Sequence, residues 1–313
     1  MTVKRLGKRS VAAARAAWSR VLGAPAAMSV PASTVKGENE AWWADYAAAA
    51  RQGFDRLHLL LSFDCDRHED ADVVLTVDSW LRERNLARTY AVPGVMLKQA
   101  ADVYARLAQD GARFINHGGR AHTEYRDGRY WSVTFYDRFS EAEAAEDIEA
   151  GHQAVLEVTG QRPIGFRAPH FGLLKTREQR ENVYRTLRRL GYRFSSSTLP
   201  GAATDGPMVD VGGLAEFPCS GSWAYPQVVF DSWSCVESPY RAVVTAAHGE
   251  AMLQTIVGLT GLGVTGVLNW YADPSHLGDG DGFRRALDKA VDLSVPGIGF
   301  EELLPESSFE RQK

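Results

Sequence analysis

Two aspartates one residue apart follow an apolar run, and they point most directly to chemistry. Asp64 and Asp66 stand at the end of segment 57–63, which has the composition of a buried strand. Successive side chains of a strand point to opposite faces, so both carboxylates face the same way while Cys65 faces away. Such a pair can share a metal ion, or one acid can bind a metal while the other acts as a base. The alternative is a pair of solvated acids where a strand becomes a loop.

The pattern around this segment predicts an α/β fold. Short apolar runs alternate with amphipathic stretches, which indicates parallel strands joined by right-handed crossovers. Strands are expected at 57–63, 88–92, 113–116, 164–168, 192–197, 214–218 and 265–271. Helices are expected at 70–85, 96–109, 140–158, 176–190, 241–260 and 281–292, with a capping box formed by Ser140 and Glu143. We therefore expect a distorted (β/α) TIM-like barrel with seven or eight parallel strands and an N-terminal helical extension.

The first 50 residues differ from the rest of the chain. Residues 3–23 are basic and helix-prone, and every charged residue before Glu38 is a lysine or an arginine. Residues 23–37 have the composition of a linker, and Trp42, Trp43 and Tyr46 belong to a helix expected to dock on the body. This divides the chain into a basic arm with linker, 1–50, and a barrel domain, 51–313. The arm either contacts an anionic membrane surface, packs on the barrel or has no fixed structure.

Composition excludes several classes of protein. The 313-residue chain is 45% apolar and carries a formal net charge of −4, which fits a globular protein and gives no reason to expect a nucleic-acid partner. Three cysteines without paired spacing do not indicate a disulfide framework. No run resembles a membrane span or the apolar part of a secretory signal. We expect a cytoplasmic protein, with peripheral membrane contact through the arm as the alternative.

Residues suited to metal binding and acid–base chemistry recur after the predicted strands, where parallel barrels place their active sites. In chain order they are Asp64 and Asp66, His117 and His122, Arg167 to His170, Glu216, and Trp270 to Asp273. The ordered set of Asp-x-Asp, two histidines and Arg-x-Pro resembles the polysaccharide deacetylase family, carbohydrate esterase family 4. Within that family the chain is similar to the Asp-x-Asp subgroup, over about residues 57–305.

The resemblance implies a hydrolase that removes an N-acetyl or N-formyl group from an amino sugar at one divalent transition metal, zinc being the first expectation. The implied metal ligands are Asp66, His117 and His122. Asp64 is the implied general base, Arg167 pairs with it and keeps it ionised, and the backbone N–H of His170 stabilises the oxyanion. Three protein ligands leave a coordination position for water and the substrate carbonyl.

The spacing of the two histidines departs from the family pattern of four residues on one helical turn. His117 and His122 are five residues apart, which places them about 140° apart around a regular helix. Both can bind one ion only if Gly118-Gly119 forms a non-helical loop or the turn is bulged.

The late strand also departs from the pattern, because the family has a histidine before a proline there as general acid. Here the order is Asp273-Pro274-Ser275-His276. Asp273 occupies the expected position, whereas the imidazole of His276 ordinarily titrates near neutral pH and is the better acid. Both remain candidates for the proton donor.

Two aromatic-rich stretches, 123–139 and 223–240, indicate where a sugar binds, because aromatic rings suit the apolar faces of sugars. We expect His170, Trp270, Tyr271 and Trp131 to contact the substrate. The substrate we expect is a nucleotide- or lipid-linked glycan intermediate. The alternative is that the aromatic stretches pack on each other or form a subunit interface.

Two other functions remain open. One is hydrolysis of a ring amide without metal, as in the allantoinase-like relatives. The other is a catalytically silent barrel that binds a sugar or a partner. Metal content discriminates among them, because only the first hypothesis requires roughly one divalent ion per chain.

Overall fold

A curled sheet lies at the centre of the protein. The computed structural model describes residues 36–50, 53–171, 174, 176–201, 206–233 and 245–305, so the predicted basic arm at 3–23 lies outside the described residues. Within these ranges eight strands form one sheet in the order β10-β1-β2-β3-β6-β7-β9-β8. All neighbouring strands are parallel except β8 and β9. The predicted barrel-like fold is therefore confirmed.

All seven predicted strands are present, although several are short. In chain order they are β1 (Leu57–Asp64), β2 (Thr89–Val92), β3 (Arg113–Asn116), β6 (Gly165–Phe166), β7 (Phe194–Ser195), β9 (Ala215–Glu216) and β10 (Gly266–Ala272). The antiparallel edge strand β8 (Val209–Asp210) was not predicted.

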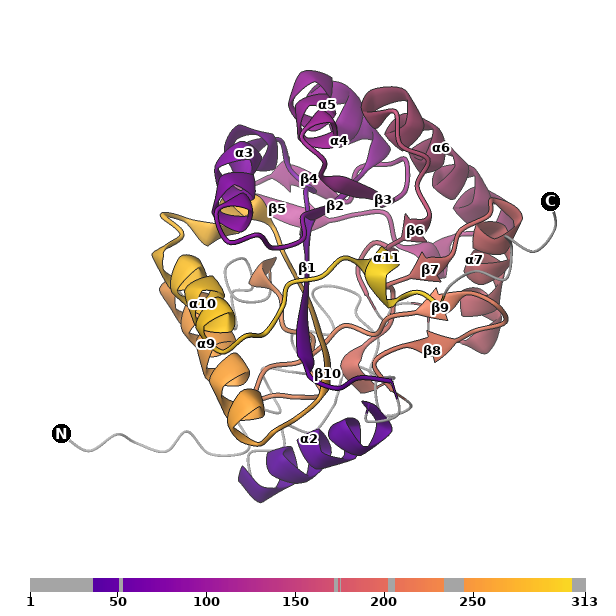
Figure 1. Ribbon diagram of the computed structural model, residues 1–313. Helices are drawn as coiled ribbons and strands as arrows, with labels where there is room; N and C mark the ends of the chain where they lie inside the picture. Colours follow the sequence, from indigo (N-terminus) through magenta and orange to yellow (C-terminus); the bar gives the residue numbers. More distant parts are fainter. Residues whose placement is uncertain are drawn as a thin grey trace, which may run out of the picture.

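Helices surround the sheet, as Figure 1 shows. They are α2 (Lys36–Ala50), α3 (His68–Arg82), α4 (Gly94–Gln99), α5 (Ala101–Gln109), α6 (Glu141–Thr159), α7 (Arg177–Arg189), α9 (Thr245–Gly261), α10 (Asp281–Asp292) and α11 (Phe300–Leu303), with 3-10 turns η2 (Tyr136–Arg138) and η4 (Pro274–Leu277). The predicted helix 96–109 divides at Ala100 into α4 and α5. The capping box of Ser140 and Glu143 begins α6 as predicted. None of the helices in the described ranges has the length and apolarity needed to cross a membrane.

Apolar side chains fill the inside of the curled sheet. The inner cluster consists of Leu60, Ala91, Ile115, Phe194, Phe217, Val267 and Phe300. Phe300 comes from α11, which lies within the ring of helices in Figure 1. A second, larger core fills the space between the strands and the helices of the N- and C-terminal parts. The inside is therefore packed, and chemistry is confined to the carboxyl ends of the strands.

The sheet closes through a loop instead of a strand ladder. The N–H of Ser220, in the segment after β9, donates to the carbonyl of Asn269 on β10 at 2.8 Å. The Asn269 N–H donates to Ser220 Oγ at 3.0 Å, and the Asn269 amide donates to the carbonyls of Phe217 and Pro218. These bonds join the open side of the sheet to β10 and make the barrel nearly closed.

Helix α2 docks on the barrel, as predicted for the helix containing Trp42, Trp43 and Tyr46. Its aromatic side chains belong to the same core as β1 and β10. The Tyr46 hydroxyl accepts from the N–H of Val267 at 2.8 Å and donates to the carbonyl of the same residue at 2.5 Å. The division of the chain at residue 50 stays a prediction, because the arm lies outside the described residues.

The stretch 123–139 contains a hairpin that was not predicted. Its strands β4 (Thr123–Arg126) and β5 (Arg129–Ser132) pair with each other and not with the main sheet. Asp127 and Gly128, both with positive φ, form the two-residue turn. An Asp-Gly pair between β-prone residues is the sequence signal that could have identified it.

Candidate active site

The predicted metal ligands come together at the ends of two strands. Asp66 follows β1, His117 follows β3, and His122 precedes β4. Asp66 Oδ1 lies 3.1 Å from His122 Nδ1 and 3.5 Å from His117 Nε2. Ligand atoms of the three side chains lie within 4.8 Å of one another, and both histidines are buried. The sequence separates these residues, but the parallel strand ends bring them into one cluster.

The atoms of this cluster fit a divalent metal ion. Asp66 Oδ1 and both ring nitrogens of His122 are buried and, apart from the contacts within this cluster, have no hydrogen-bonding partner among the described residues. His117 Nδ1 lies 2.8 Å from the carbonyl of Arg167, which places its hydrogen on Nδ1 and leaves Nε2 free to bind a metal. Ligands about 2.1 Å from a tetrahedral ion lie about 3.4 Å from each other, close to the observed separations. Burial lowers the pKa of His117 well below its usual value, which favours the neutral, ligating imidazole.

The segment between the histidines is a loop. Residues 117–122 are not helical, and Gly118 has a φ of +81°. A Cβ at Gly118 would lie 2.5 Å from Asp147 Oδ2, so a larger residue does not fit there. The loop brings the two imidazole rings to a centroid distance of 4.2 Å. Of the two arrangements that would allow both histidines to bind one ion, the structure has the non-helical Gly118-Gly119 loop and not a bulged helical turn.

Asp64 and Arg167 form a buried ion pair beside this cluster. Arg167 Nη1 lies 2.5 Å from Asp64 Oδ1, and His117 Nε2 lies 3.6 Å from Asp64 Oδ2. Burial raises the pKa of Asp64 to about 7, Arg167 opposes this rise, and the charge of Asp66 adds to it. A cation held by Asp66 and the histidines would lower that pKa by its own charge. Asp64 thus lies against the cluster but is not among the three residues whose ligand atoms lie within 4.8 Å of one another, and its role as general base stays a prediction.

The five residues just described, Asp64, Asp66, His117, His122 and Arg167, all lie within residues 52–195, which match the family model for polysaccharide deacetylases. The matched stretch is a little under half of the chain, and over it the chain is similar to the polysaccharide deacetylase family. This match confirms the predicted class of enzyme, a hydrolase that deacetylates acetylated sugars. No curated protein sequence matches the chain significantly.

Solved structures share the fold of this deacetylase at low sequence identity. A Mycobacterium smegmatis protein described as a candidate polysaccharide deacetylase has a TM-score of 0.61 and 17% identity, over 80% of this chain and 89% of that one. A Bacillus anthracis protein described as a pseudoenzyme of carbohydrate esterase family 4 has a TM-score of 0.51 and 10% identity, over 80% of this chain and 66% of that one. Because a pseudoenzyme shares the fold, activity must be argued from the site residues.

The late strand of the deacetylase places both candidate proton donors in one buried cluster. His276 Nδ1 lies 3.3 Å from Asp273 Oδ2 and 3.1 Å from the hydroxyl of Ser232. The same hydroxyl accepts from the N–H of Asp273 at 2.7 Å. Burial, and then the nearby charges of Asp70 and Asp66, raise the pKa of Asp273 well above its usual value. A protonated Asp273 can donate a proton, so the structure keeps both residues as candidates.

A polar link between the first and last strand ends was not predicted. Asp70 Oδ1 accepts from the N–H of Ser275 at 2.9 Å and from its hydroxyl at 2.6 Å, and Asp70 Oδ2 accepts from the N–H of Arg67 at 3.0 Å. Arg67 Nη2 lies 2.5 Å from Ser275 Oγ. Asp70 therefore joins the segment carrying Asp66 to the turn carrying His276. In the sequence, the position of Asp70 in the first turn of α3 indicated only a helix-capping role.

Two predicted substrate contacts lie beside the site. His170 is next to the metal cluster, and Tyr271 is next to the Asp64–Arg167 ion pair. His170 has a positive φ, and its ring centroid is 5.9 Å from that of His122. Burial, and then the charge of His122, lower the pKa of His170 to about 4. Tyr271 stacks on Phe171, and both rings face the Arg167 guanidinium. Both residues are placed where a substrate bound at the cluster would lie, and their contact with substrate stays a prediction.

The prediction that Trp270 contacts the substrate is wrong. Trp270 is buried, its indole donates to the carbonyl of Gly221 at 3.0 Å, and it packs against Phe230 in the outer core. Neighbouring residues of a strand face opposite sides, so Tyr271 faces inward and Trp270 faces the helices.

Trp131 does not lie where a residue that stacks on the sugar was expected. It lies on the face of the hairpin opposite Tyr130, and the Arg129 guanidinium covers its ring at 3.5 Å. Tyr130 is on the side toward the site, where Arg67 lies 5.0 Å from its ring and Glu69 accepts from its hydroxyl. Of the second aromatic stretch, Trp233 is 5.9 Å from Arg67, Phe230 is core, and Tyr240 lies outside the described residues.

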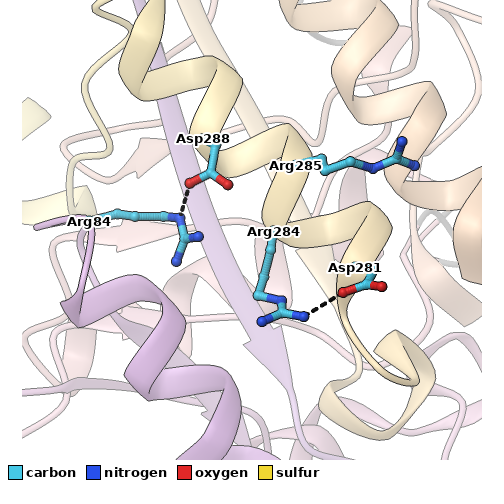
Figure 2. Close-up of a pocket in the computed structure, with 5 residues that line it drawn as sticks. All are labelled: Arg84, Asp281, Arg284, Arg285 and Asp288. Carbon is cyan, nitrogen blue, oxygen red and sulfur yellow. Dashed lines mark hydrogen bonds and ion pairs between the residues drawn. The ribbon is translucent and has the colours of Figure 1, made fainter.

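A surface pocket of about 500 Å³ lies elsewhere, between the end of α3 and α10. Figure 2 shows its lining residues, of which Arg84 pairs with Asp288 and Arg284 pairs with Asp281. Its charged groups largely neutralise one another, and none of the predicted site residues lines it. The pocket is not the deacetylase site.

Proposed function

We propose that this protein is a metal-dependent deacetylase that hydrolyses the N-acyl group of an amino sugar. The observation that carries the proposal is the convergence of Asp66, His117 and His122 on one point with unpartnered ligand atoms. Buried polar atoms without partners are costly, and a bound cation gives these atoms their partner. The buried pair of Asp64 and Arg167 beside the cluster supplies the second requirement, a positioned base.

Each residue has a role set by its place. A divalent cation held by the three ligands supplies Lewis acidity and lowers the pKa of water. Asp64 takes a proton from the attacking water, and Arg167 fixes the carboxylate that does so. The carbonyl of Arg167 also holds the Nδ1 hydrogen of His117, so this residue orients both the base and a ligand. The cluster of Asp273 and His276 gives a proton to the leaving amine, because an unprotonated amide nitrogen leaves too poorly.

For the substrate we propose an acylated amino sugar joined through phosphate to a nucleotide or a lipid, in the cytoplasm. Aromatic rings beside the site, Tyr271, Phe171 and Tyr130, support a sugar ring as the bound group. The basic arm, with Lys4, Arg5, Lys8 and Arg9 near its start, supports an anionic carrier or a peripheral contact with an anionic membrane.

Metal content and acyl release test the proposal together. The purified protein should hold roughly one divalent ion per chain and release acetate or formate from N-acylated amino sugars. Chelation should abolish release, and added Zn²⁺ should restore it. A metal-free protein with full ring-amide hydrolase activity supports the allantoinase-like alternative. A protein that binds sugar without turnover, with or without metal, supports the silent barrel.

Replacing the candidate acids should identify the proton donor. If His276 is the donor, His276→Ala should lower the turnover rate by about 10²–10⁴-fold, with metal content unchanged and the alkaline limb of the pH–rate profile lost. His58→Ala removes a histidine at the opposite end of β1 and should leave turnover near wild type. An inactive Asp273→Asn beside an active His276→Ala would assign the role to Asp273 instead.

A further inference from the structure

The loop that separates the two histidine ligands is held by hydrogen bonds from three directions. The N–H of Gly118 donates to Asn116 Oδ1 at 2.9 Å, within the same strand end. The carbonyls of Gly118 and Gly119 accept from the N–H groups of Gly94 and Val95 at the start of α4, at 2.9 and 3.0 Å. The loop therefore has one arrangement fixed by its neighbours, although it lacks the regular bonds of a helix.

The third set of hydrogen bonds goes to a buried carboxylate on α6, that of Asp147. Asp147 is 1% exposed, and its Oδ1 accepts from the N–H of Gly119 at 3.1 Å and from the N–H of Arg120 at 2.9 Å. Its Oδ2 accepts from the hydroxyl of Tyr136 at 2.7 Å. A carboxylate that receives two adjacent N–H groups fixes the direction of the backbone between them. That backbone leads directly to His122, two residues further on.

Close packing leaves no room for larger residues where this loop meets α6. A Cβ at Gly119 would lie 2.6 Å from Ala150, and one at Gly151 would lie 2.5 Å from the carbonyl carbon of Gly118. The loop thus lies directly on α6, with glycines at the points of contact. Asp147 is the charged group of that contact, one turn before Gly151 on the helix.

We propose that Asp147 is a positioning residue of the metal site, which holds His117 and His122 on one ion despite their five-residue spacing. A helix supplies that geometry when ligands are four residues apart, and here the carboxylate of α6 supplies it instead. The inference rests on the metal site of the proposed function. It does not rest on the reaction, because Asp147 does not contact the three ligand atoms or the Asp64–Arg167 pair.

Metal affinity measures this role directly. Asp147→Ala should weaken Zn²⁺ binding by about 10–100-fold, the usual effect of removing a group that orients a ligand. Asp147→Asn keeps an oxygen for the two N–H groups and can face its amide to Tyr136, so its affinity should stay within about threefold of wild type. Affinity is obtained by competition with a chromogenic chelator, and urea unfolding of the metal-free proteins measures stability separately.

Asp78 offers a matched control. It is also buried, on α3, and accepts from a tyrosine hydroxyl, that of Tyr90, at 2.8 Å and from Arg88 at 2.8 Å. Asp78→Ala should destabilise the fold while its folded fraction binds Zn²⁺ with wild-type affinity. Wild-type affinity in Asp147→Ala would overturn the positioning role. Equal weakening in Asp147→Asn and Asp147→Ala would also overturn it, since charge and not bond geometry would then govern binding. Absence of Zn²⁺ binding by the wild type would instead contradict the proposed function.

Discussion

Replacing His122 with alanine should reduce bound metal from roughly one ion per chain to nearly none. His122 Nε2 is buried without a hydrogen-bonding partner among the described residues, and Nδ1 faces Asp66 Oδ1 at 3.1 Å, as expected of two ligands of one ion. Asp66 and His117 alone leave an ion with too few protein ligands to be retained in a buried site. Loss of Lewis acidity worth several kcal/mol should lower the acyl-release rate by about 10³-fold or more.

Elemental analysis of the purified variant gives the metal content, and circular dichroism shows whether the fold is retained. His152→Ala is the matched control, because His152 lies on α6 and contacts the hydroxyl of Tyr192 instead of the metal cluster. It should keep wild-type metal content. Full occupancy in His122→Ala would show that another residue completes the site.

Replacing Asp64 with asparagine should separate catalysis from metal binding. The variant should keep its metal, because Asp64 pairs with Arg167 and is not a main ligand, and its turnover should fall by about 10²–10⁴-fold, the usual range for a general base. The change also leaves the fully buried Arg167 without its anionic partner, which should destabilise the fold by about 3–5 kcal/mol. Rates must therefore be measured well below the melting temperature.

Asp66→Asn is the informative comparison for this variant. Asp66 lies 3.1 Å from His122 Nδ1 and 3.5 Å from His117 Nε2, whereas Asp64 approaches only His117, at 3.6 Å. We therefore expect Asp66→Asn to lose metal and Asp64→Asn to retain it. The reverse result would exchange the roles of the two acids.

The fold was largely predictable because its signals are local. Apolar runs mark the strands, the capping box of Ser140 marks the start of α6, and Gly160 ends that helix with a φ of +70°. The antiparallel strand β8 was missed because two residues give no periodic pattern. The predicted parallel topology was then enough to place Asp64, Asp66, His117 and Arg167 at the same end of the barrel, although the sequence gives no distances between them.

The parts of the site that escaped prediction depend on contacts between distant segments. Nothing near Asp70 indicates that it accepts hydrogen bonds from Ser275, which lies in the last part of the described chain. Nothing near Asp147 indicates that it faces the histidine loop. The error at Trp270 was avoidable, however, because Trp270 and Tyr271 are adjacent in a strand and cannot both face the site.

The pairing of β1 constrains the order in which the protein can fold. β1 forms seven residue pairs with β10 but only two with β2, its neighbour in sequence. β1 ends at residue 64 and β10 begins at residue 266, so the strand that carries Asp64 is synthesised long before its principal partner. Until β10 arrives, the apolar run 57–61 has an unpaired edge, and closing so long a loop is entropically costly. A nascent chain that stops after β9 would therefore lack a fixed strand on which to build the metal site, and the catalytic centre is completed only when synthesis of the barrel is nearly finished.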